Sequence, residues 1–274
     1  MLLNVLNSAE PTIDLDSILN PSRKLISRAR KALKRYGAGY LMSVSADPKT
    51  IKGQKKGYVT AILYLAPGSL SGYNVCPKAT VGCLAGCLHT AGNPVYFAGK
   101  EKARLARTKF MFQQPELFKA LLVAELQSFI RKADSADLIP VVRLNGTSDI
   151  VWEKKFPELF NLFSAVQFYD YTKIGNRLMS HWALPANYRL TFSRAESNHS
   201  EALAVLANGG NVAMVFRGAG DNRFPKPFPA AYAGFGLING DETDLRFLDE
   251  PGTIVGLRAK GLAKHDASGF VIDL

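Results

Sequence analysis

Short apolar runs alternate with helix-type periodicity along the chain from position 58 onward. Six runs have the length and the β-branched or aromatic content of buried strands, and they span residues 58–65, 139–144, 165–171, 188–193, 211–217 and 253–257. Helical patterns or helix-length connections lie between them, at residues 99–112, 115–133, 157–163, 177–184 and 200–208. This alternation predicts βαβ units with a parallel sheet, and therefore an α/β fold.

Residues 1–57 do not share this alternation. Residues 1–20 have the composition of an irregular arm, and a helical pattern follows from Arg23 to Tyr36 and ends at Gly37. We therefore expect two parts, a basic N-terminal extension with one helix at residues 1–57 and an α/β barrel-like domain at residues 58–274.

A long connection, residues 218–252, precedes the last predicted strand and is rich in glycine, proline and aromatic residues. It is longer than the irregular loops of compact domains usually are, which predicts a functional lid or an insertion.

The composition is typical of a soluble globular protein, with 47% hydrophobic and 21% charged residues among 274. The formal net charge of +11 implies attraction to polyanions, so we expect a nucleotide or a nucleic acid as partner. No apolar run reaches the length of a membrane span, and the first residues are too polar for a signal peptide. We therefore expect no membrane partner and a cytoplasmic location, while the oligomeric state stays open.

The predicted helix at residues 23–36 carries charges of one sign, because seven lysines or arginines and no acidic residue lie between positions 23 and 35. A solvated helix face usually mixes signs, so this helix is a candidate for phosphate contact. The alternative is a basic helix that is merely solvated. The residues expected to bind nucleic acid are Arg23, Lys24, Arg28, Arg30, Lys31, Lys34 and Arg35.

All three cysteines, Cys76, Cys83 and Cys87, lie in the loop after the first predicted strand, with a glycine before each of the last two. Thiolates are soft ligands that select zinc, cuprous copper or iron–sulfur clusters, so this loop predicts a metal site. One alternative is structural zinc with His89 as the fourth ligand. Another is a four-iron cluster held by three thiolates with one iron open. A reduced loop without metal is a further alternative, and a disulfide fits a reducing compartment poorly.

Polar residues gather after the predicted strands, and in parallel sheets ligands bind at the carboxyl ends of the strands. The candidates for catalysis there are Asp149, Tyr169, Asp170 and Lys173. Each has a structural alternative: Asp149 starts the next turn, and Asp170 and Lys173 form a surface ion pair. A weaker hypothesis is phosphodiester cleavage with Tyr169 or Tyr171 as nucleophile, although no paired histidines are present to hold a metal for it.

Six βα units with a three-cysteine loop after the first strand resemble the radical S-adenosylmethionine enzymes. The resemblance implies a partial (β/α)6 TIM-like barrel and a [4Fe-4S] cluster on Cys76, Cys83 and Cys87. It also implies S-adenosylmethionine on the open iron, cleaved to a deoxyadenosyl radical. The implied cofactor-binding residues are Asn145, Gly146, Thr147 and Ser148 near the methionine amino group, and Ser193, Arg194 and Glu196 near the ribose or carboxylate. The usual spacing of that family, Cys-x3-Cys-x2-Cys, differs from the Cys-x6-Cys-x3-Cys of this chain.

The chain also resembles a group of phage- and plasmid-encoded proteins that share such a cysteine loop. The resemblance extends to the strand end R-L-N-G-T-S-D at residues 143–149 and to residues 245–249 and 256–261. It implies a phage protein but no particular activity.

Two functional hypotheses follow. The first is an iron–sulfur enzyme of the radical S-adenosylmethionine type that acts on a nucleotide or nucleic acid. The alternative is a phage- or plasmid-type nucleic-acid-binding or replication-associated protein with a structural zinc site.

Overall fold

The six apolar runs lie side by side in chain order in the computed structural model. They form the strands β2 (Tyr58–Leu63), β3 (Ile139–Arg143), β4 (Gln167–Thr172), β5 (Tyr188–Ser193), β6 (Val212–Arg217) and β9 (Ile254–Arg258). Each strand of this series pairs with the next in parallel orientation. The structure describes residues 13–44, 48–90, 97–179, 183–218 and 227–274. The predicted α/β class and parallel sheet are therefore confirmed.

Four further strands extend this series to a sheet of ten strands. β1 (Met42–Val44) pairs with β2 in antiparallel orientation, and β8 (Phe235–Asn239) lies parallel to β9. β7 (Ala231–Tyr232) pairs with β8 in antiparallel orientation. The sheet is open, with β1 and β7 at its two ends.

The last strand, β10 (Val271–Asp273), pairs with β6 beyond the point where β6 separates from β5. β5 contacts β6 only at Val212 and Ala213, whereas β10 is in register with residues 215–217. β9 pairs with the other edge of β6, so β10 lies on the edge that faces β5. The C-terminal segment thereby reaches the carboxyl ends of the central strands.

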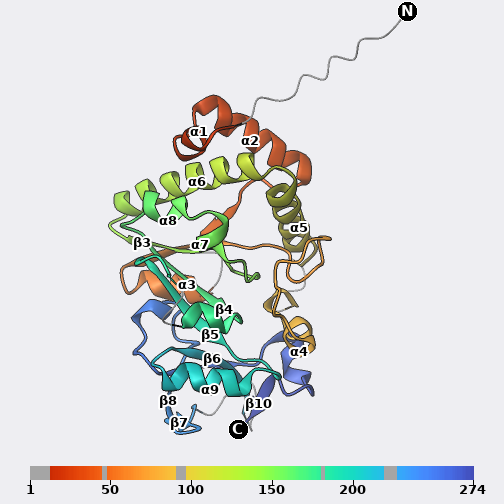
Figure 1. Cartoon of the computed structure of the whole chain (residues 1–274), viewed down its shortest axis with the longest axis vertical. Coiled ribbons are helices and arrows are strands. Elements are labelled where there is room, and N and C mark those ends of the chain that lie inside the picture. The colour runs from red at the N-terminus through yellow and green to blue at the C-terminus, as the bar shows by residue number, and fades with distance from the viewer. Residues whose placement is uncertain (1–12, 45–47, 91–96, 180–182, 219–226) are drawn as a thin grey trace, which may run out of the picture.

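The main core lies between one face of the sheet and a layer of helices (Figure 1). This layer comprises α1 (Leu15–Leu19), α2 (Arg23–Tyr36), α5 (Phe97–Gln113), α6 (Pro115–Ser135), α7 (Trp152–Lys155) and α8 (Glu158–Leu162). The central helix α6 begins with proline, whose fixed φ suits the first turn, and ten of its residues are buried. A smaller core lies under α9 (His199–Ala207), where Val205 and Leu206 pack against Phe192 and Met214.

The N-terminal region is more elaborate than one helix on an extension. It contains α1, α2 and α3 (Pro48–Gln54), and β1 joins the sheet. α2 buries Ala29 and Leu33 completely in the main core. Residues 1–12 of the expected arm lie outside the described residues.

Two other local predictions are corrected. The helix expected at residues 177–184 is a short 3-10 turn, η3 (Gly175–Leu178), and residues 180–182 lie outside the described part. The connection expected as a lid or an insertion contains β7, β8 and a 3-10 turn, η4 (Arg246–Leu248), while residues 219–226 are outside the described part.

The part of this connection around η4 covers the sheet face opposite the main core. Leu245 packs with Val141 and Tyr169. Arg143 of β3 donates a hydrogen bond from Nη1 to Oδ2 of Asp244 at 2.7 Å, and both residues are buried. Alternate residues of a strand point to opposite faces, so the side chains of β3 and β4 that turn away from the main core need this cover. The connection is thus part of the packed structure.

None of the helices in the described part of the chain is both long and apolar enough to span a bilayer.

The Arg143–Asp244 pair gives the first prediction. Replacing Asp244 by Ala leaves a buried guanidinium without its closest counter-charge, so the free energy of unfolding should fall by about 3–5 kcal/mol. Chemical denaturation measures this loss. The matched control is Asp273→Ala, which removes an Arg217–Asp273 pair of the same 2.7 Å separation from the surface. Similar losses in the two variants would contradict the expected difference between a buried and a surface pair.

Candidate functional site

Cys76 is held between the start of its own loop and the end of β3. Its Sγ accepts a hydrogen bond from the backbone N–H of Gly68 at 3.3 Å and donates one to the carbonyl oxygen of Thr147 at 3.7 Å. The Thr147 hydroxyl donates to the carbonyl of Leu65 at 2.6 Å. Two strand ends therefore fix the position of this thiol.

Cys83 and Cys87 lie further along the same loop. Cys83 is in the one-turn helix α4 (Val81–Ala85), whose N-cap Thr80 accepts a hydrogen bond from the Cys83 N–H at 3.2 Å. Cys87 precedes the 3-10 turn η1 (Leu88–Thr90). None of the three cysteines forms a disulfide, and all three are partly exposed. The loop therefore keeps three sulfur ligands accessible.

Burial and neighbouring charges act on the Cys76 thiol. Burial raises the pKa of Cys76 to about 11; the hydrogen bond from Gly68 opposes this rise, and the charges of Cys87, Asp149 and Cys83 add to it. The Cys76 thiol is therefore protonated at neutral pH unless a cation compensates its charge. A raised pKa disfavours the thiolate form that binds metal, so a metal centre at Cys76 would itself have to supply the compensating charge.

The described side chains do not form a preassembled metal site. Within the described residues, no three His, Cys, Asp or Glu side chains lie close enough to hold one ion together. The side chain of His89, the expected fourth zinc ligand, lies outside the described part of the structure. The zinc alternative is therefore neither supported nor tested by these side chains.

Glu196, after β5, anchors the start of α4. Its carboxylate accepts hydrogen bonds from the Thr80 hydroxyl at 2.7 Å and from the Gly82 N–H at 2.8 Å. Partial burial alone would raise the pKa of Glu196, but the hydrogen bonds from Thr80 and from backbone N–H groups lower it overall. This carboxylate, expected near a ribose, thus positions the helix that carries Cys83.

The C-terminal segment also packs against α4. A Cβ at Gly82 would overlap Ser268 and approach Phe270, and one at Gly86 would lie 3.2 Å from Ala263. Arg194 donates hydrogen bonds from Nη1 to the carbonyls of Gly269 and Phe270. The glycines before Cys83 and Cys87 therefore permit close approach, as their positions in the sequence suggested.

The loop after β3 is stabilised by its own side chains. Asn145 Oδ1 accepts hydrogen bonds from the Ser148 hydroxyl, the Ile150 N–H and the Trp152 indole. Gly146 is closely packed, because a Cβ there would lie 2.6 Å from Ile62 and from the ring of Tyr64. The residues expected to bind the methionine amino group, Asn145 to Ser148, thus hold the cysteine loop and their own turn, and their contact with a cofactor stays a prediction.

Asp149 connects the loops that follow three strands, β2, β3 and β4. Its N–H donates to the carbonyl of Val75 at 2.8 Å, and its carboxylate accepts from the Lys173 N–H at 2.7 Å and from Arg177 at 3.3 Å. Burial raises the pKa of Asp149, although these hydrogen bonds and the charge of Arg177 oppose the rise. Asp149 therefore does more than start a turn.

Arg177 is a central residue that the sequence did not single out. Its guanidinium is completely buried and donates two hydrogen bonds to Glu153, at 2.8 and 2.9 Å. It also donates to Asp149 and to the hydroxyls of Thr172 and Tyr188. The one feature of the sequence that could have indicated this role is the position of Arg177 shortly after the end of β4.

Asp170 and Tyr169 are interior residues. Asp170 accepts hydrogen bonds from the N–H groups of Leu144 and Asn145 and from the hydroxyl of Tyr188. It is completely buried, so the alternative of a surface ion pair with Lys173 is wrong. Tyr169 is also completely buried, with its hydroxyl 3.4 Å from that of Thr60. A phosphodiester cannot reach it there, which argues against Tyr169 as a nucleophile.

Lys173 and Ser193 form a polar pair at the partly exposed edge. Nζ of Lys173 donates a hydrogen bond to Oγ of Ser193 at 2.5 Å and lies 5.6 Å from the ring centroid of Phe270. Of the four candidates for catalysis, Asp149, Tyr169 and Asp170 are buried, whereas Lys173 is partly exposed. It is therefore the candidate best placed to meet a ligand at this edge.

The expected nucleic-acid-binding residues lie elsewhere, on α2. Figure 1 shows α2 at one end of the molecule, with α6 between it and the sheet, whereas α4 lies close to the C-terminal elements. Arg28 is partly exposed and the other six cations of α2 are exposed. The structure therefore separates the predicted sites into a cysteine edge and a basic helix.

Together these features define an α/β protein with an open parallel sheet and a cysteine-bearing loop at the carboxyl ends of its strands. The chain belongs to the Gene product 88 family, whose model matches residues 40–274. This assignment supports the expected phage resemblance, and no radical S-adenosylmethionine family matched. Neither the curated proteins nor the solved structures contain a match to the chain.

The buried Asp170 predicts a pH-dependent stability. Burial raises its pKa to about 6, against the opposing effects of Arg143 and of the hydrogen bonds from Asn145, Tyr188 and Leu144. The folded protein then holds a proton that the unfolded chain, with an Asp pKa of about 3.9, has released, so the free energy of unfolding should fall by about 2–3 kcal/mol between pH 4 and 6.

Denaturation with urea across this pH range measures the effect. Asp170→Asn should remove this pH dependence and, because an amide cannot accept both backbone N–H bonds, cost about 1–3 kcal/mol at neutral pH. Asp134→Asn, at an exposed position of α6, should keep the wild-type profile. An unchanged profile in Asp170→Asn would assign the pH dependence to another group.

The contacts of Glu196 predict the reactivity of Cys83. Glu196→Ala removes the acceptor for Thr80 and Gly82, so α4 should loosen and Cys83 should react several-fold faster with iodoacetamide. Mass spectrometry of the labelled peptides identifies the thiol. Glu116→Ala removes another first-turn carboxylate, on α6, and serves as control. Equal labelling rates in the two variants would show that Glu196 does not hold α4.

Proposed function

We propose that this protein is an iron–sulfur enzyme whose cluster is bound by Cys76, Cys83 and Cys87 and which acts on a nucleotide or nucleic acid. The observation that carries the proposal is the set of three partly exposed thiols, none of them in a disulfide, at the carboxyl end of the first of six parallel strands. Ligand sites of parallel α/β proteins lie at this end of the strands.

The strand order favours a partial barrel as the finer description of the fold. β2, β3, β4, β5, β6 and β9 are neighbours in chain order and parallel, as successive strands of a (β/α) barrel are. The separation of β6 from β5 leaves a lateral opening that β10 partly fills. We propose a partial (β/α)6 arrangement of these strands, open at the sides.

The contacts of the thiols suit the proposed cluster. Hydrogen bonds to cysteine sulfurs and partial exposure are the means by which proteins adjust cluster potentials, and the Gly68 N–H supplies such a bond to Cys76. Three protein ligands would leave one iron of a [4Fe-4S] cluster open, where bound S-adenosylmethionine would supply radical chemistry. Lys173 and Ser193 would then be the polar groups of this chain nearest to a ligand at the edge.

The substrate class rests on charge. The net charge of +11 and the exposed cations of α2 favour an anionic substrate, since long-range attraction raises its local concentration.

Anaerobic purification tests the proposal. The wild-type protein should be brown and contain about four iron and four sulfide per chain, as a [4Fe-4S] cluster requires. Single Ala variants of Cys76, Cys83 and Cys87 should each lose most of the iron and the visible absorption. Lys78→Ala, in the same loop but without a sulfur ligand, is the control.

The alternative function is tested by the same measurement. A colourless protein with one zinc per chain, which His89→Ala loses together with loop stability, would favour the nucleic-acid-binding protein with structural zinc. Protein without iron, sulfide or zinc under these conditions would contradict both metal assignments.

A further inference from the structure

Helix α2 carries its cations in two rows. At 3.6 residues per turn, Arg23, Arg30 and Lys34 fall along one side of the helix, and Lys24, Arg28, Lys31 and Arg35 fall along the other. Ala29 and Leu33 face the opposite way, into the main core. The two rows therefore flank the exposed ridge of the helix.

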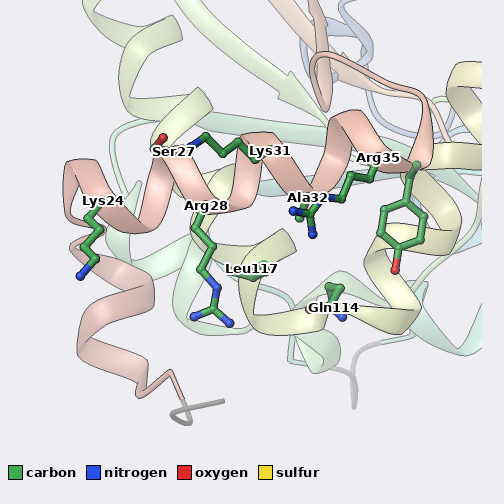
Figure 2. Close-up of a pocket in the computed structure, with 9 residues that line it drawn as sticks. Lys24, Ser27, Arg28, Lys31, Ala32, Arg35, Gln114 and Leu117 are labelled. Carbon is green, nitrogen blue, oxygen red and sulfur yellow. The ribbon is translucent and has the colours of Figure 1, made fainter. Parts of the chain in front are cut away.

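Each row borders its own groove between α2 and α6. The first groove has a volume of about 780 Å³ and is lined by Lys24, Arg28, Lys31 and Arg35. Figure 2 shows these cations spaced along α2, with Gln114 and Leu117 of the α6 region on the other side of the groove. The floor thus offers an amide and an apolar side chain but no acid.

The second groove lies along the other row and has a volume of about 470 Å³. Arg23, Arg30 and Lys34 line its α2 side. Across from them lie Gln127, Ser128 and Arg131 of α6. Lys31 borders both grooves, so the ridge between them is itself cationic.

No carboxylate is among the residues that line either groove in the described structure. Glu125, on the same helix as Gln127, turns inward, where its carboxylate accepts hydrogen bonds from the N–H groups of Leu41 and Met42. With Glu125 directed away from both grooves, the residues that line them keep a positive potential. Such a surface is complementary to a phosphate backbone.

We propose that α2 lies in the major groove of a DNA duplex and that each row of cations contacts one phosphate strand. An α-helix with its side chains is about 10–12 Å wide, and the major groove of B-DNA is about 12 Å wide. The row from Lys24 to Arg35 spans about 16 Å at 1.5 Å per residue, or about five base-pair steps. A single strand has one backbone and would occupy one groove only, and the major groove of duplex RNA is too narrow for a helix.

Neutral donors within α6 and at its N-cap, Gln114, complete the interface. Gln114 in the first groove and Gln127 and Ser128 in the second can donate hydrogen bonds to phosphate oxygens, which position a duplex without reading its sequence. The inference rests on the proposed function only for the substrate class, since it identifies the polyanion as duplex DNA. Binding through α2 needs no metal centre.

Fluorescence anisotropy with a labelled 24-base-pair duplex tests this interface, with the corresponding single strand as competitor. One variant replaces Arg23, Arg30 and Lys34 by Gln, and a second replaces Lys24, Arg28, Lys31 and Arg35 by Gln; glutamine keeps the helix propensity. The control replaces three exposed cations outside both grooves, Lys55, Arg189 and Lys264, by Gln, and so matches the charge change of the first variant.

The wild-type protein should prefer the duplex, with log Kobs falling with log salt at a slope of about −6 for seven phosphate contacts. Each row variant should reduce duplex affinity at least tenfold and make the slope shallower by about 3, whereas the control should stay close to wild type. Circular dichroism confirms that the helix is retained in the variants.

Three results would overturn the inference. One is a row variant that binds the duplex as well as the control does. Another is single-stranded DNA bound as tightly as the duplex, with the loss confined to one row. The third is binding to phosphatidylserine vesicles, abolished in both row variants, without duplex binding. The Cys76, Cys83 and Cys87 variants should bind the duplex normally, so this inference and the metal assignment fail independently.

Discussion

The hydrogen bonds that Asp170 accepts at the end of β3 are the interaction on which the carboxyl edge depends. The N–H groups of Leu144 and Asn145 lie where the strand ends, and the buried carboxylate of the next strand satisfies both. Burial of the Asp170 carboxylate is unfavourable, as its raised pKa shows. Without it, however, the two backbone N–H groups would be buried without an acceptor at the start of the loop that follows. Asn145 can then orient the turn that reaches Thr147, and Thr147 in turn contacts Cys76.

The cysteine loop is consequently shaped by parts of the chain that are remote in sequence. Thr147 contacts Cys76, Glu196 holds the start of α4, and Phe270 packs close to Gly82. Hydrogen bonds within the loop add to this geometry, since the Gly68 N–H donates to Cys76 Sγ and the Cys83 N–H donates to the Thr80 hydroxyl. The shape of the loop is therefore set both by its own bonds and by remote segments.

The sequence predicted what depends on local pattern and missed what depends on distant partners. The apolar run at residues 188–193 coincides with β5, because a strand buried on both faces is visible in its composition. β8 was missed, because Phe235–Asn239 includes a glycine and an asparagine and is stabilised by pairing with β9. The sequence placed Asp170 and Glu196 at the correct edge of the sheet. Their partners, the N–H groups of residues 144, 145 and 82, became visible only in the fold.

The position of Phe270 has a consequence for biosynthesis. The ribosome synthesises a chain from its N-terminus to its C-terminus. Phe270 is therefore added 188 positions after Gly82, against which it packs. During most of translation the cysteines therefore belong to an unclamped segment. A metal centre of the kind proposed above would meet an accessible loop if it bound the nascent polypeptide, whereas binding after completion would have to displace the closing segment or enter beside it.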